Sequence, residues 1–132
     1  MQIYALRLKA GQDLKRELAT FTQLHDLRAG FVLTCVGSLK RAALRHAGSD
    51  ATTEYDEPFE IVSLAGTLSV GSSLHLHMSI SDGGGAVLGG HLQEGTLIDT
   101  SAEIVIGDAD HLVFTREPDP KTGFLELVIA DR

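Results

Sequence analysis

The segment 73–81 alternates between apolar and polar side chains without a fault, and its polar face carries His75 and His77. Its apolar face consists of Leu74, Leu76, Met78 and Ile80. An unbroken period of two is typical of a β-strand that buries only one of its faces. The two imidazoles are therefore expected on the polar face, roughly 6.5–7 Å apart along the strand.

The glycine run Gly83–Gly85 follows this strand and predicts a tight turn into the next one. A two-residue loop would set apolar residues of one strand against polar residues of the other. A three-residue loop keeps the faces matched, because it places Ile80 opposite Leu88 and His77 opposite His91. The pattern therefore favours the three-residue loop, and it brings His91 to the same polar face as the first two histidines.

Three neutral imidazoles on one face suit Zn²⁺ or another divalent transition metal, with a further position open for water or a small-molecule ligand. Water bound there would have a lowered pKa and could act as a nucleophile. We therefore identify His75, His77 and His91 as candidate metal ligands. The adjacent pair Gly89-Gly90 leaves room for a ligand or for another stretch of backbone. The alternative is a polar face whose histidines hydrogen-bond to serine and water or line a subunit interface.

The rest of the chain predicts one principal helix and many short strands. Asp13 is a candidate N-cap, and apolar residues follow it at helical spacing, so a helix is expected over about 13–26. Strands are expected at 3–8, 31–36, 42–47, 59–64 with a continuation at 67–70, 74–80, 87–92, 103–106, 112–115 and 124–129. This order predicts an α+β fold, a mainly antiparallel β-sheet or half-open barrel with the helix packed on it, in a single domain spanning 1–132.

The composition argues against several functions. The chain has 11 Lys and Arg and 18 Asp and Glu. The resulting net charge of −7 disfavours binding to DNA or to anionic lipid by electrostatic attraction alone. One cysteine excludes an internal disulfide framework, and Cys35 is expected to be a buried thiol because it lies in an apolar run. Neither a signal peptide nor a membrane-spanning apolar run is recognisable, so the cytoplasm is the expected location.

No motif identifies a catalytic residue, and the weak candidates are Arg45 and Glu60. Arg45 and Arg116 are expected to pair with a substrate anion or with Glu60, Glu103 or Glu117. Glu60 lies within an apolar strand, where a buried carboxylate would need a partner and could serve as a general base. The sequence contains no Ser/His/Asp order, phosphate loop or dinucleotide fingerprint. Whether the protein is an enzyme is therefore left open.

Eight short runs, spread in order over the chain, carry a resemblance to a known family. They are Gly37-Ser38-Leu39, Ala43-Leu44-Arg45, Glu57 to Leu68, His75-Leu76-His77, Ser81-Asp82, Gly89 to Leu92, Thr100 to Glu103 and Phe114 to Phe124. Together they resemble the PPC domain, which is shared by plants and prokaryotes. The resemblance implies an α/β domain with an antiparallel sheet that assembles as a homotrimer.

The resemblance also bears on the site. Stand-alone prokaryotic members retain three histidines at the positions of His75, His77 and His91, where a metal can sit. In plants the domain follows AT-hook motifs in nuclear DNA-binding proteins, and Phe59-Glu60-Ile61 is similar to the stretch linked there with partner contacts. The AT-hook core, Arg-Gly-Arg-Pro, is absent here. The DNA-binding function therefore does not carry over residue by residue.

Three functions compete at this stage. The first is a homotrimeric protein with a zinc-type site, with or without hydrolase- or lyase-like chemistry. The second is a DNA-associated regulatory module. The third is a non-catalytic module whose trimer presents a surface to protein partners, and no membrane partner is expected for any of them. A DNA contact would have to come from a local basic patch formed by Lys9, Lys15, Arg16, Lys40, Arg41 and Arg45.

Overall fold

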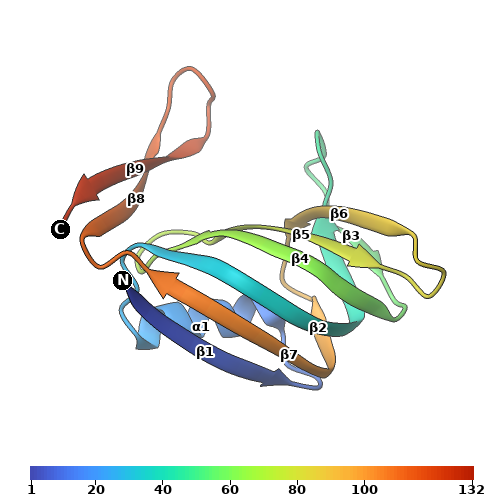
Figure 1. Cartoon of the computed structure of the whole chain (residues 1–132). Coiled ribbons are helices and arrows are strands. Elements are labelled where there is room, and N and C mark those ends of the chain that lie inside the picture. Colours follow the sequence, from blue (N-terminus) through green and yellow to red (C-terminus); the bar gives the residue numbers. More distant parts are fainter.

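The computed structural model describes residues 1–132 and contains one helix and nine strands (Figure 1). The elements are β1 (Gln2–Lys9), α1 (Leu14–Leu24), β2 (Gly30–Arg45), β3 (Thr53–Tyr55), β4 (Phe59–Leu68), β5 (His75–Ser81), β6 (Val87–Leu92), β7 (Leu97–Asp108), β8 (Leu112–Pro118) and β9 (Leu125–Asp131). All strand pairs are antiparallel, so the predicted α+β fold with a mainly antiparallel sheet is confirmed.

Seven strands form one sheet in the order β1-β7-β2-β4-β5-β6, with β3 paired to β2. The long strand β2 also reaches β6, through the pairs Leu44–Leu92 and Arg45–His91. This contact curls the sheet, while β1 remains a free edge, so the sheet stays half open and does not close into a barrel. Strands β8 and β9 form a separate hairpin that projects from the sheet (Figure 1).

Strand β2 corrects one prediction, because the two strands expected at 31–36 and 42–47 are a single strand of 16 residues. Its pairing with β7 shifts register between Val32 and Thr34, between Gly37 and Ser38, and again beyond Leu39. Such irregularities bend a strand and change which side chains face the core. The apolar pattern is therefore interrupted near residue 40 although the strand continues.

Helix α1 is slightly shorter than the predicted 13–26. Asp13 is its N-cap, as expected, and its carboxylate accepts a hydrogen bond from the Arg16 backbone N–H at 3.1 Å. The helix ends at Leu24, and Asp26 has a positive φ of 48°, which does not continue a right-handed helix. The single helix, α1, does not have the length and apolar character needed to cross a bilayer.

One hydrophobic core lies between α1 and the concave face of the curled sheet (Figure 1). Leu14 and Leu18 of the helix are completely buried, and Ile104 and Ile106 of β7 belong to the same cluster. The predicted apolar faces of β5 and β6 contribute Leu76, Met78, Ile80 and Leu92. Because this face of β5 points into the core, the histidines of the same strand point away from it.

Candidate metal centre

The β5–β6 hairpin positions the three histidines as the sequence predicted. The Asp82 N–H donates to the Ala86 carbonyl at 2.9 Å, which closes a three-residue loop, and Gly85 has a positive φ of 86°. His77 lies directly opposite His91 in this register. His75 and His77 are exposed and His91 is half-buried, so the imidazoles stand on the open face of the sheet.

The three imidazoles converge. Their candidate donor atoms all lie within 4.8 Å of one another, and His77 Nε2 is 3.1 Å from His91 Nδ1. The rings of His75 and His91 are nearly parallel, with centroids 5.7 Å apart. Nitrogen ligands of a tetrahedral zinc ion lie about 3.3 Å from one another, because each Zn–N bond is about 2.0–2.1 Å. The donor set and its spacing therefore fit a divalent transition metal.

The surroundings also favour the neutral imidazole, which is the form that binds a metal. Although His75 is exposed, partial desolvation by its neighbours lowers its pKa, and the nearby Arg116 guanidinium lowers it further. Burial likewise lowers the pKa of His91, followed by the charges of His77 and Arg45. Both shifts favour the uncharged ring, which keeps a lone pair available for a metal.

Strand β6 is fixed beside β2 and β5 by close backbone contacts. A Cβ at Gly89 would lie 2.6 Å from the Met78 carbonyl oxygen, and one at Gly90 would lie 2.8 Å from the Arg45 carbonyl oxygen. The sequence predicted that these glycines leave room for a ligand or for another stretch of backbone. The structure shows that neighbouring backbone occupies this space. His46 adds a support that the sequence did not reveal, since its Nδ1–H donates to the Gly89 carbonyl at 2.9 Å.

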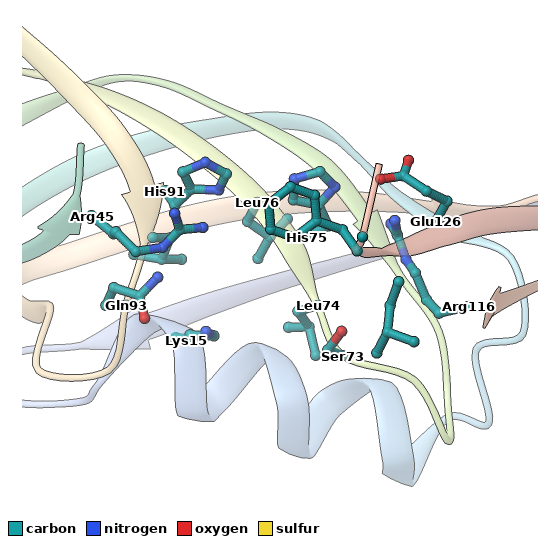
Figure 2. Close-up of a pocket in the computed structure, with 14 residues that line it drawn as sticks. Lys15, Arg45, Ser73, Leu74, His75, Leu76, His91, Gln93, Arg116 and Glu126 are labelled. Carbon is teal, nitrogen blue, oxygen red and sulfur yellow. The ribbon is translucent and has the colours of Figure 1, made fainter. Parts of the chain in front are cut away.

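A cavity of about 760 Å³ opens beside His75 and His91. Figure 2 shows Arg45 next to His91 at one end of the cavity and Arg116 next to His75 at the other. Lys15, from the first turn of α1, lies on the helix side. The hairpin β8–β9 and the loop within it contribute Arg116, Gly123, Phe124, Leu125 and Glu126.

The two weak catalytic candidates lie in different places. Arg45 lines the histidine cavity. Glu60 does not, and the expectation that it is buried is wrong: Phe59 and Ile61 turn inward, and alternation leaves the Glu60 side chain exposed in a separate, smaller cavity beside Asp82. Cys35 is buried as predicted, and burial raises the pKa of its thiol to about 11.

Sequence reasoning missed other residues that line the cavity. The sequence pattern predicts no role in the site for Lys15, Gln93 or Glu126. They lie on α1, after β6 and on β9, and only the folded chain brings them to one cavity. No local pattern could have indicated this, since periodicity reports the faces of one element and not the approach of distant ones.

Comparison with known proteins shows extensive similarity. The family model described as the Plants and Prokaryotes Conserved (PCC) domain matches residues 1–110. A protein from Synechococcus sp. (strain JA-3-3Ab) named Bifunctional protein GlmU is 49% identical over 131 residues, which cover 98% of this chain and 21% of that protein. The chain thus spans about a fifth of the length of the curated relatives it matches.

Solved structures share the whole fold. A hypothetical protein from Salmonella enterica is 44% identical with a TM-score of 0.97, over 99% of this chain and 94% of the other. A metal-containing protein from Archaeoglobus fulgidus is 25% identical with a TM-score of 0.79, over 97% and 94% of the two chains. A candidate DNA-binding protein from Bacteroides thetaiotaomicron, 21% identical with a TM-score of 0.84 over 96% and 91%, shares the fold.

Proposed function

The chain belongs to the Plants and Prokaryotes Conserved domain family, and from this premise we propose that it is a metal-binding member. His75, His77 and His91 hold a divalent transition metal ion, with zinc as the first candidate. The observation that carries the proposal is the convergence of three imidazole donor atoms within 4.8 Å on one face of the sheet. The metal-containing protein from Archaeoglobus fulgidus, which has the same fold, supports it.

The donor set explains the choice of metal. Neutral imidazoles suit zinc and its neighbours in the first transition row better than magnesium or calcium, which prefer oxygen ligands. When bound, such an ion supplies Lewis-acid chemistry at its remaining coordination position. The chain's own residues hold the ion and leave the cavity side open, because β5 and β6 place all three rings on the outer face. We assign no reaction to the site.

Elemental analysis of protein purified without an affinity tag and without chelator tests the metal site. Wild-type protein is expected to contain close to one equivalent of zinc or another transition metal per chain. The variant His77→Ala should lose it, because two imidazoles hold a metal ion far less tightly than three. His111→Ala is the matched control, since His111 is exposed and lies outside the cluster. Metal-free wild-type protein would overturn the proposal.

The proposal includes assembly into a homotrimer in the cytoplasm. Besides the family, the support is the hairpin strand β9, on which Leu125, Leu127 and Ile129 form an exposed apolar row. A monomer that leaves such a row in water gains by covering it. Sedimentation velocity is expected to give a trimer for wild type and a smaller species for Ile129→Glu. Thr115→Glu, on the opposite face of the hairpin, is the matched control and should remain trimeric.

A purely structural interaction module is the second candidate, and the same exposed row favours it. It is distinguished by the variant in which all three histidines become Ala. If that variant keeps both its assembly and its protein partners, the histidines serve neither, and the metal would be an independent property. The net charge of −7 disfavours the DNA-associated function, because DNA is itself negatively charged. Steeply salt-dependent binding to duplex DNA would support that function instead.

A further inference from the structure

We propose that the cavity beside the three histidines binds a small organic molecule that carries an oxyanion group, a carboxylate or a phosphate, and that Arg45 and Arg116 recognise this group. The inference deepens the proposed metal site and rests on it for the role of the histidines.

The first observation is that the cationic side chains of the cavity lack ionic partners. The Arg45 guanidinium donates one hydrogen bond to the Ser49 carbonyl at 3.3 Å, and Arg116 donates one to the Thr67 hydroxyl at 3.0 Å. Neither comes within 4.0 Å of a carboxylate, and neither does Lys15 of the same cavity. Only three cationic side chains of the protein, Arg16, Arg41 and Arg132, form ion pairs, so what distinguishes Arg45 and Arg116 from the other unpaired cations is their position in the cavity. The structural ion pairs considered from sequence for Arg45 and Arg116 are therefore not formed.

The second observation is the concentration of positive charge in an acidic protein. Three cations, Lys15, Arg45 and Arg116, line the cavity against one carboxylate, Glu126, although the chain as a whole carries a net charge of −7. Several positive charges around one concave surface attract and orient anions.

The third observation is the geometry of the cavity. The two guanidinium groups lie at opposite ends, Arg45 beside His91 and Arg116 beside His75, as Figure 2 shows. The volume of about 760 Å³ is in the range of sites for small organic ligands. Leu74, Phe124 and Leu125 add apolar lining. A guanidinium presents a planar fork of donors that matches the oxygens of a carboxylate or a phosphate. The cavity therefore fits a short molecule with an oxyanion at one or both ends.

Isothermal titration calorimetry on the full chain, made metal-free with chelator and then dialysed, tests the proposal. The probes are succinate, inorganic phosphate and the neutral diamide of succinate. Succinate, phosphate or both are expected to bind, and the diamide is not. Arg45→Gln and Arg116→Gln are each expected to weaken binding at least about tenfold, because each removes a charge-assisted hydrogen bond. Arg28→Gln is the matched control, since Arg28 is exposed, lies outside the cavity and changes the net charge equally.

Binding of the neutral diamide as tight as that of succinate would show that no oxyanion is recognised and would overturn the inference. Preference for succinate identifies a carboxylate ligand, and preference for phosphate identifies a phosphorylated one. Failure of both probes to bind metal-free and zinc-loaded protein overturns the inference, as does binding that the two arginine variants leave unchanged. Neither result touches the metal proposal, which elemental analysis decides separately. If a Gln variant melts well below wild type, the Arg→Lys variant at the same position replaces it, and it should retain more of the affinity than Gln because it keeps the charge.

Discussion

Strand β5 of the main sheet and strand β9 of the C-terminal hairpin each carry an apolar row on one face, but the row is buried on β5 and exposed on β9. On β5 the apolar residues Leu76, Met78 and Ile80 are at most 3% exposed. On β9 the apolar residues Leu125 and Ile129 are 55% and 59% exposed. Period-two alternation therefore identifies the apolar face of a strand but does not predict what covers that face. The main sheet is covered by its own helix, whereas the hairpin has no such layer in its own chain.

The largest expected effect is the removal of a side chain from the covered region. Ile104 of β7 is completely buried within the core cluster. Ile104→Ala is expected to lower the free energy of unfolding by about 2–5 kcal/mol, because it removes buried methyl groups and leaves a cavity. Urea denaturation followed by circular dichroism measures this. A loss below about 1 kcal/mol would mean that the sheet and helix are less tightly packed than the burial indicates.

The next effect sharpens the comparison at two glycines with positive φ. A Cβ at Gly66 of β4 would lie 1.9 Å from the His75 carbonyl oxygen, whereas one at Gly123 in the hairpin loop meets no atom within 4 Å. Gly66→Ala is expected to cost at least about 2 kcal/mol, from backbone strain together with a clash. Gly123→Ala should cost about 1 kcal/mol from strain alone. Equal losses in urea denaturation would contradict the close packing of β4 on β5.

A smaller effect comes from Cys35 of the main sheet. Burial raises the pKa of its thiol from 9.0 to about 11, so the unfolded chain releases this proton at a lower pH than the folded chain does. Stability contributed by the thiol is therefore full below pH 9 and falls as the pH rises toward 11. Between pH 8 and pH 10 the wild type is expected to lose about 1 kcal/mol more than Cys35→Ala. Parallel pH profiles for the two proteins would show that the thiol titrates normally.

The smallest effect is expected in the hairpin. Ile129→Ala makes the same chemical change as Ile104→Ala, but at a side chain that is 59% exposed. In protein dilute enough to be monomeric, it should change the free energy of unfolding by less than about 0.5 kcal/mol. Urea denaturation at several protein concentrations measures this, and a cost that grows with concentration would report the proposed trimer. A cost above 2 kcal/mol in the dissociated chain would remove the contrast between the two regions.

Much of the candidate site could be predicted from sequence. The alternation at 73–81, the glycine turn and the match of apolar faces were enough to pair His77 with His91 and Ile80 with Leu88. These are short-range relations, fixed by the period of a strand and the length of a loop. The helix was equally readable, because Asp13 and the apolar spacing after it mark its beginning and its buried face.

Other features could not be read in this way. The continuity of β2 was hidden, because bulges change which side chains face the core. The exposure of Glu60 was predicted wrongly. Its apolar neighbours Phe59 and Ile61 face the core, while Glu60 itself lies on the opposite face of the strand. In both strands the apolar pattern indicated a strand correctly, but which side chains face the core depended on the partner strands.

Local pattern was enough to assign residues to strand faces, and therefore to bring three histidines together on the polar side of β5 and β6. The surroundings of these histidines follow from the packing of distant elements. Lys15 comes from α1, Arg45 from the end of β2 and Arg116 from β8, and the curl of the sheet brings them to one cavity. Side-chain periodicity is a short-range property set by the backbone geometry of each element, whereas the meeting of distant elements depends on how the core packs.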